Sequence, residues 1–127
     1  MPPGRRTSIR RVYVIDDDLA VLESTAFLLE TFGFECRTFP SAVQFLKSVD
    51  GLEPGCILTD LSMPEMDGWA LREALEKRSN DWPMFLMSSE GRPELRECAI
   101  LLGFSGFLPK PLDADAFAAM LERVPAG

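Results

Sequence analysis

Four short apolar segments of this sequence each end in side chains that could do chemistry. In chain order, these side chains are Asp16, Asp17, Asp60, Ser88 and Lys110. If the segments are parallel strands of one sheet, their carboxyl ends meet at one edge, which is where open α/β sheets bind ligands. Three carboxylates, a hydroxyl and an ammonium group would then converge there.

This set of groups is suited to phosphoryl transfer. Converging carboxylates repel one another unless a cation joins them. Oxygen ligands without histidine or cysteine favour a hard ion, and a site that shares waters and phosphate oxygens favours Mg²⁺ over Ca²⁺. A hydroxyl and a lysine that face a metal-bound carboxylate can hold a phosphoryl group. Asp60 could then act as the nucleophile and form an aspartyl phosphate.

The elements that must position these groups alternate between strand-like and helical segments. The sequence predicts strands over residues 12–15, 34–39, 56–59, 84–87 and 107–108, and helices over 19–32, 41–48, 69–78, 93–102 and 114–123. This (βα)5 pattern predicts an α/β fold, a doubly wound parallel five-stranded sheet with helices on both faces. Because Pro109 cannot donate a ladder hydrogen bond, the fifth strand is expected at an edge.

Composition and charge exclude several classes of protein. The chain has 127 residues, enough for one domain, with 13 basic and 20 acidic residues and no histidine. Residues 1–11 contain four arginines and no acid, so the rest of the chain carries −11. Such an acidic body repels phosphate backbones, so direct nucleic-acid binding by this domain is not expected. Without histidine, Ser-His-Asp and Cys-His catalysis and histidine-based metal sites are excluded.

The cysteines and the termini bear on location and domain organisation. Three cysteines without metal-ligand spacing, two of them in apolar strand-like segments, favour free thiols and a reducing compartment. No apolar stretch approaches the roughly 18 residues of a membrane span and no signal peptide is evident, so we expect a cytoplasmic protein without membrane contact. We expect a flexible basic leader over residues 1–9, one domain over 10–124, and a tail or the start of a linker over 125–127.

Four motifs together resemble the receiver domain of bacterial response regulators, in the CheY-like superfamily. They are VIDD ending at Asp17, TDLSMPEMDG over residues 59–68, FLMSS ending at Ser89, and FLPKP ending at Pro111. Each motif lies at the end of a predicted strand, and the resemblance covers about residues 10–124. The segment over residues 39–46 further resembles receivers of the FixJ type.

The resemblance implies a flavodoxin-like sheet with strand order 2-1-3-4-5, and it implies a role for each acid. Asp60 would accept a phosphoryl group from a sensor histidine kinase or a phosphotransfer protein. The carboxylates of Asp17 and Asp60 and the backbone carbonyl of Ser62 would bind Mg²⁺ directly, and Asp16 would act through water. The domain would then be a regulatory phosphoacceptor that catalyses only its own phosphorylation and dephosphorylation.

By the same resemblance, Ser88 is the switch hydroxyl and Lys110 is the phosphate-binding lysine. Phe107 is the aromatic residue whose rotamer follows phosphorylation, and the peptide bond from Lys110 to Pro111 is cis. The face built by the last two helices and the strand between them would change on phosphorylation. That face would control an output or a partner, and a homodimer through it is possible.

Each of these residues also has a structural explanation. Asp16 and Asp17 could favour a helix dipole, and we assign Asp18 as the helix cap. Alone, Asp60 could cap a loop and Ser88 could be a satisfied loop hydroxyl. Likewise, a lone lysine before a proline is ordinarily a solvated surface residue, and an aromatic residue in an edge strand ordinarily belongs to the core.

Two other functions compete with the receiver hypothesis. A haloacid-dehalogenase-type phosphatase could use Asp16 as the nucleophile of an Asp-x-Asp motif, with a later serine and lysine. Such enzymes usually carry a cap and more chain, and the segment over residues 60–68 would have no explanation. A flavodoxin-like cofactor module would need Ser/Thr/Gly-rich turns in place of the three acids. We therefore predict a receiver.

Overall fold

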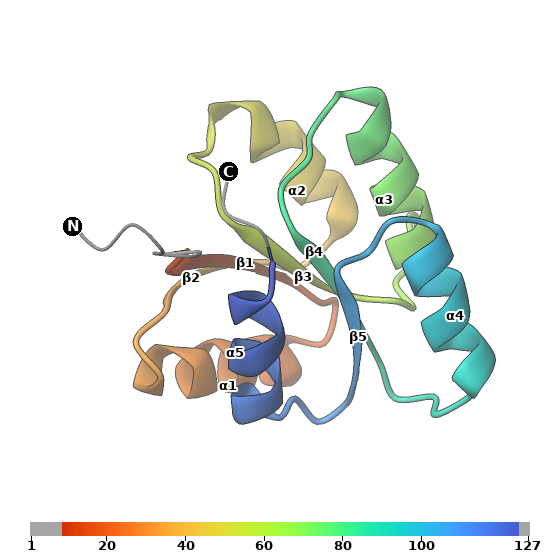
Figure 1. Cartoon of the computed structure of the whole chain (residues 1–127). Helices are drawn as coiled ribbons and strands as arrows, with labels where there is room; N and C mark the ends of the chain where they lie inside the picture. Colours follow the sequence, from red (N-terminus) through yellow and green to blue (C-terminus); the bar gives the residue numbers. More distant parts are fainter. Residues whose placement is uncertain (1–8, 125–127) are drawn as a thin grey trace.

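The computed structural model describes residues 9–124 as alternating strands and helices (Figure 1). The strands are β1 (Arg11–Ile15), β2 (Glu35–Phe39), β3 (Cys56–Asp60), β4 (Met84–Ser88) and β5 (Gly106–Pro109). The helices are α1 (Leu19–Thr31), α2 (Ala42–Ser48), α3 (Gly68–Lys77), α4 (Pro93–Leu101) and α5 (Ala114–Glu122), and a 3₁₀ turn covers Val49–Gly51. Every predicted element is present, with each end shifted by at most one residue. Of the predicted leader and tail, all but residue 9 lie outside the described residues.

The strands form one parallel sheet in the order β2-β1-β3-β4-β5. The predicted strand order and the edge position inferred from Pro109 are both confirmed, since β5 pairs only with β4 among the described strands. Pro109 is the last residue of β5 and lies opposite Ser88 in the ladder. The edge therefore tolerates a residue that has no amide hydrogen.

Helices cover both faces of the sheet, with α1 and α5 on one face and α2, α3 and α4 on the other (Figure 1). All residues of β3 and β4 are buried, because each side chain packs on one helical layer or the other. Alternate β4 residues show the division, since Phe85 packs with α1 and α5 while Leu86 packs with α2, α3 and α4. The carboxyl ends of the strands therefore form a single edge between the two layers.

Short polar residues fix the helix starts near this edge. The carboxylate of Asp18 accepts hydrogen bonds from the amides of Ala20 and Val21, at 3.0 and 3.2 Å, and so caps α1 as predicted. Asp113 caps α5 in the same way, through the amide of Ala116 at 3.1 Å. No helix within residues 9–124 combines the length and the apolar character that a membrane crossing requires.

The cysteines are free thiols, as expected. Cys56 is fully buried in β3, and burial raises the pKa of its thiol far above the usual value. Cys36 is half-buried in β2, where burial and the charge of Glu30 raise its thiol pKa to about 11. Both thiols are therefore protonated and weakly nucleophilic at neutral pH.

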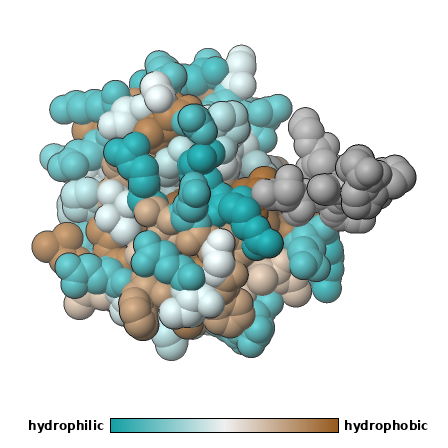
Figure 2. All heavy atoms as spheres, turned by 90° about the vertical axis from the view of Figure 1, so that its left-hand side faces the viewer, coloured by the Kyte–Doolittle hydropathy of each residue, from teal (hydrophilic) through white to brown (hydrophobic). Residues whose placement is uncertain are grey.

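Helix α1 presents apolar side chains to solvent. Leu19 and Phe27 are the most exposed of them, and Phe32, just past the end of the helix, is also exposed. Figure 2 shows this side of the molecule, where apolar side chains are more frequent in the lower half, at the height of α1 in Figure 1. Isolated exposed apolar residues are common on proteins, so exposure alone does not indicate a binding surface. This surface is of interest because it lies beside the edge formed by the carboxyl ends of the strands.

Candidate functional site

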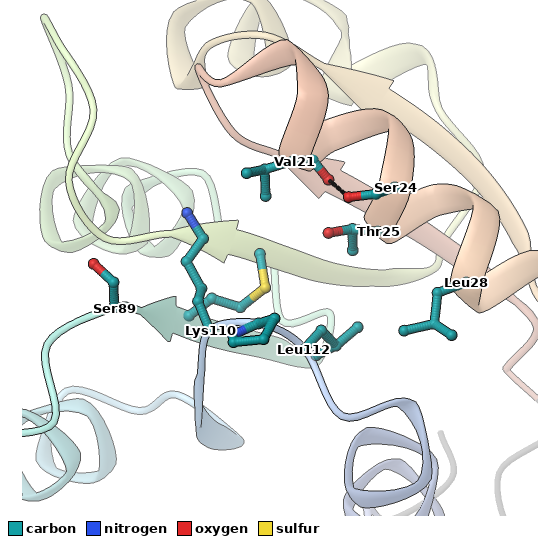
Figure 3. Close-up of a pocket in the computed structure, with 9 residues that line it drawn as sticks. Val21, Ser24, Thr25, Leu28, Ser89, Lys110 and Leu112 are labelled. Atoms are coloured by element: carbon teal, nitrogen blue, oxygen red, sulfur yellow. Dashed lines mark hydrogen bonds between the residues drawn. The ribbon is translucent and has the colours of Figure 1, made fainter.

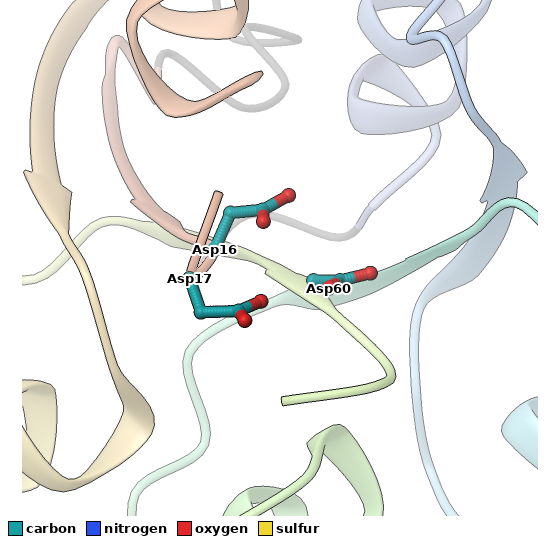
Figure 4. Close-up of side chains that lie close together, drawn as sticks. All are labelled: Asp16, Asp17 and Asp60. Carbon is teal, nitrogen blue, oxygen red and sulfur yellow. The ribbon is translucent and has the colours of Figure 1, made fainter. Parts of the chain in front are cut away.

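Strands β1 and β3 bring the three predicted acids together. Asp16 and Asp17 follow β1 directly, and Asp60 is the last residue of the neighbouring strand β3. One carboxylate oxygen from each residue lies within 4.8 Å of the other two, and Figure 4 shows the side chains of Asp16 and Asp17 reaching toward Asp60. Asp16 is completely buried and Asp60 is 6% exposed, whereas Asp17 is open to solvent.

Lys110 joins this acidic cluster from the end of β5. Its ammonium nitrogen lies 2.8 Å from Oδ2 of Asp16 and 3.2 Å from Oδ1 of Asp60. Its backbone amide donates to the carbonyl of Ser88 at 2.9 Å, and its peptide bond to Pro111 is cis. The lysine is therefore tied to the end of β4 while its side chain bridges two buried carboxylates.

Burial and charge shift the pKa values of the two central groups. Burial, followed by the charge of Asp16, raises the pKa of Asp60 above its usual value, although Lys110 opposes this shift. Burial alone would lower the pKa of Lys110, but hydrogen bonding and charge from Asp16 and Asp60 outweigh it and raise that pKa. At neutral pH the lysine is therefore a fixed positive charge inside the acidic cluster.

The donor set fits a divalent metal ion. Oδ1 of Asp16 accepts a hydrogen bond from the amide of Asp18 at 2.9 Å. Oδ2 of Asp16 is buried, and among residues 9–124 it accepts no hydrogen bond of good geometry, so the ammonium group of Lys110, at 2.8 Å, is its one charged partner in this part of the chain. All candidate ligand atoms are oxygens, and the exposure of Asp17 would let a hard ion enter and keep waters, as Mg²⁺ does.

The predicted switch residues lie on the β4 and β5 side of the cluster. Ser88 ends β4 and is buried, and its hydroxyl accepts a hydrogen bond from the amide of Glu90 at 3.0 Å. Phe107 lies in β5 opposite Leu86 and is 4% exposed, within the core beneath α4. Ser62 is exposed two residues beyond Asp60, in a groove of about 480 Å³ between the loop after β3 and the start of α4.

A second groove, of about 570 Å³, runs from the acidic cluster along α1. Its lining residues are Val21, Ser24, Thr25, Leu28, Met87, Ser89, Lys110, Pro111 and Leu112. Figure 3 shows Lys110 extending between Ser89 and the α1 side chains, with Leu28 and Leu112 farther along. This groove is not among the features predicted from the sequence, although the i, i+4, i+7 spacing of Val21, Thr25 and Leu28 indicates a shared helix face.

Comparison with known proteins identifies the family. The family model described as the response regulator receiver domain matches residues 12–122. The transcriptional regulatory protein FixJ of Bradyrhizobium diazoefficiens is 37% identical over 116 residues, which is 91% of this chain and 57% of that protein. The DNA-binding transcriptional regulator NtrC of Escherichia coli is 31% identical over 112 residues, 88% of this chain and 24% of that protein.

Solved structures agree with the sequence comparison. Full-length FixJ from B. japonicum has a TM-score of 0.82 at 37% identity, with 91% of this chain and 57% of that chain covered. The structure named FixJ-N has a TM-score of 0.83 at 28% identity and covers 92% of this chain and 94% of that chain. The chain thus spans little more than half the length of the full FixJ proteins it matches.

These matches settle the class of protein. Receivers are regulatory domains of two-component systems, so the chain is a regulatory domain and not a classical enzyme. The phosphatase hypothesis has no support in the comparisons, and Asp16, its proposed nucleophile, is buried against Lys110. The chain belongs to the response regulator receiver domain family.

Proposed function

We propose that Asp60 accepts a phosphoryl group from the phosphohistidine of a sensor kinase or a phosphotransfer protein. The observation that supports this most strongly is the position of its carboxylate, which lies 3.2 Å from the ammonium group of Lys110 and within 4.8 Å of carboxylate oxygens of two further acids. A carboxylate oxygen of Asp60 attacks phosphorus, and the bond from phosphorus to the donor nitrogen breaks in line with it. The histidine nitrogen retains that electron pair and takes up a proton.

Lys110 and Ser88 stabilise the transferred group in this proposal. The ammonium group of Lys110, held 3.2 Å from Asp60, would neutralise charge on a phosphoryl oxygen. The Ser88 hydroxyl, which now accepts from the amide of Glu90, keeps its own proton free to donate to a second phosphoryl oxygen. The Lys110 ammonium group acts through its charge and the Ser88 hydroxyl through a hydrogen bond, so the phosphoryl transfer requires no further base.

Asp16, Asp17 and Asp60, together with the backbone carbonyl of Ser62, would hold Mg²⁺ in this proposal. The buried Asp16 oxygen, which only Lys110 contacts among the polar groups of residues 9–124, and the all-oxygen donor set support it. Bound there, Mg²⁺ supplies positive charge that offsets the carboxylates and the phosphoryl oxygens. The protein's own contribution is to keep the three acids within reach of one another on two adjacent strands.

We expect Mg²⁺ to stabilise the fold and Asp17→Asn to remove this effect. An ion that binds only the folded state adds about 1.4 kcal/mol at ten times its Kd, or about 5 °C in Tm for a domain of this size. Asp17 is exposed, so its replacement weakens metal binding with little cost to the metal-free fold. Thermal unfolding with EDTA and with Mg²⁺ measures the shift.

The neighbouring Asp18→Asn variant is the control for the Mg²⁺ experiment. It removes the same charge, and asparagine caps a helix as well as aspartate does. This variant should keep the full Mg²⁺ shift. An equal shift in wild-type protein, Asp17→Asn and Asp18→Asn would rule out Asp17 as a metal ligand.

The phosphodonor would approach along the α1 groove. The groove connects Lys110 with an apolar strip of α1, and exposed apolar residues of that helix extend the surface (Figures 2 and 3). An amphipathic helix that carries the phosphohistidine could place its apolar face there while the phosphoryl group reaches Asp60. FixJ and NtrC are named as transcriptional regulators, and the output of the present chain would be controlled at a different face.

That output face is formed by α4, β5 and α5. Movement of Ser88 toward a phosphoryl group would be transmitted to Phe107 and then to α4, because Ser88 and Phe107 share one face of adjacent strands and Phe107 belongs to the apolar cluster that includes residues of α4. The altered face would bind a partner or a second copy of the domain.

Mapping the acyl phosphate tests the proposal. The protein is incubated with acetyl phosphate and Mg²⁺, reduced with borohydride, digested and analysed by mass spectrometry. We expect the reduced residue at Asp60. Label at Asp16, or steady hydrolysis of a phosphomonoester substrate, would instead support the phosphatase alternative.

A further inference from the structure

We propose that Arg96 is a positioning residue that holds the ring of Phe107 in its buried place and so favours the unphosphorylated conformation. The inference rests on the switch role proposed above for Phe107. It adds a regulatory element on α4, a helix with no residue in the acidic cluster.

The contact is a cation–π interaction between α4 and β5. The guanidinium carbon of Arg96 lies 5.5 Å from the centre of the Phe107 ring. Phe107 is buried, whereas Arg96 is exposed and has no ion-pair partner among residues 9–124. The guanidinium group therefore has one specific contact with the rest of the described protein, and that contact is the ring.

Packing on α4 fixes where the arginine can reach. Leu95 and Ala99 are buried in the same apolar cluster as Phe107, so this side of α4 lies against the ring. Arg96 follows Leu95 at the border of that buried side, from which a long side chain can extend over the neighbouring strand. The ring is thus enclosed by apolar side chains and covered by a cation.

The ladder places Phe107 diagonally across from Ser88, which carries the proposed switch hydroxyl. In the parallel register Leu86 lies opposite Phe107, and Ser88 lies opposite Pro109. Residues two apart on a strand share a face, so Ser88 and Phe107 lie on the same face of adjacent strands. A shift of Ser88 toward Asp60 would open space next to the ring, and the Arg96 contact opposes any change in ring position.

The expected effect on the conformational equilibrium follows from the strength of such contacts. A cation over an aromatic face at a partly exposed site stabilises by roughly 0.5–1 kcal/mol, which corresponds to about a two- to five-fold change in an equilibrium constant. Removing the guanidinium group should therefore raise the population with a displaced ring by about two- to five-fold.

The test is ¹⁹F NMR of protein labelled with fluorophenylalanine, in EDTA and without any phosphodonor. The Phe107 signal is assigned by its absence in Phe107→Leu, and its solvent isotope shift between H₂O and D₂O measures ring exposure. We expect a larger isotope shift for Phe107 in Arg96→Gln than in wild-type protein, and an intermediate value in Arg96→Lys.

Arg37→Gln is a matched control, because Arg37 lies over Phe39 at the same 5.5 Å but on β2, at the opposite edge of the sheet. It should leave the Phe107 signal unchanged. The proposal is overturned if Arg96→Gln lowers stability but leaves the Phe107 isotope shift at the wild-type value. Because this measurement uses no phosphodonor, its outcome is independent of whether Asp60 is the phosphoacceptor.

Discussion

The Asp60→Asn variant should form no acyl phosphate with acetyl phosphate and Mg²⁺, at any time at which wild-type protein is fully labelled. Asparagine keeps the shape of the side chain, and its carbonyl oxygen can still accept from Lys110, which lies 3.2 Å from the carboxylate. The neutral amide oxygen is a far weaker nucleophile than a carboxylate, so the loss should be complete. Phosphate incorporation measured by intact-protein mass spectrometry checks this.

Asp113→Asn is the control for the loss of labelling expected in Asp60→Asn. Asp113 caps α5 at the same edge of the molecule, and asparagine is an equally good cap, so folding and phosphoryl uptake should both be preserved. Undiminished labelling of Asp60→Asn, with the phosphate on Asp16 or Asp17, would show that another acid of the cluster is the acceptor.

Asp60→Asn should also be more stable than wild-type protein in metal-free buffer at neutral pH. Burial and the charge of Asp16 raise the pKa of Asp60, so from pH 3.8 up to that raised pKa the folded state retains a proton that the unfolded chain has lost. The free energy of unfolding therefore falls as the pH rises through this window. Urea unfolding in EDTA should show the advantage of Asp60→Asn disappearing as the pH is lowered to 3.8.

The fold and most of the site could be predicted because their causes are local. Strands buried on both faces are continuous apolar runs, and Asp18, Gly33 and Pro93 mark helix ends through capping and backbone conformation. Once the strands are parallel, their carboxyl ends must share an edge. The convergence of Asp60 with Asp16 and Asp17 then follows from strand order alone.

The contacts that could not be predicted depend on the paths that long side chains take between elements. Lys110 is closer to Asp16, at 2.8 Å from its buried Oδ2, than to Asp60, at 3.2 Å from its Oδ1. Arg96 and Arg72 are the two arginines within the described helices, and only the packing of α4 against β5 shows that Arg96 covers Phe107. Sequence spacing indicates neither which carboxylate Lys110 approaches more closely nor which arginine covers Phe107.

Lys110→Met should cost about 3 kcal/mol of unfolding free energy in metal-free buffer at neutral pH, in the lower part of the range for breaking a buried ion pair. The lysine bridges two buried carboxylates, and methionine fills similar space without charge. Partial solvent access of Lys110 and proton uptake by the acids limit the loss. Because the pKa of Lys110 is raised, its contribution is complete below pH 10.5 and is lost as the pH rises through the raised value.

Lys110→Met should also slow phosphoryl uptake on Asp60 by about 100-fold or more, since it removes a fixed charge from the transition state. Saturating Mg²⁺ should restore part of the stability, because a bound cation offsets the same carboxylates, but it should not restore the rate. Lys77→Met is the control: this exposed lysine pairs with Glu73 at 3.8 Å, so its loss should change stability by less than about 0.5 kcal/mol. Equal urea midpoints and equal labelling rates for the two variants would mean that the Lys110 bridge neither supports the fold nor serves phosphoryl transfer.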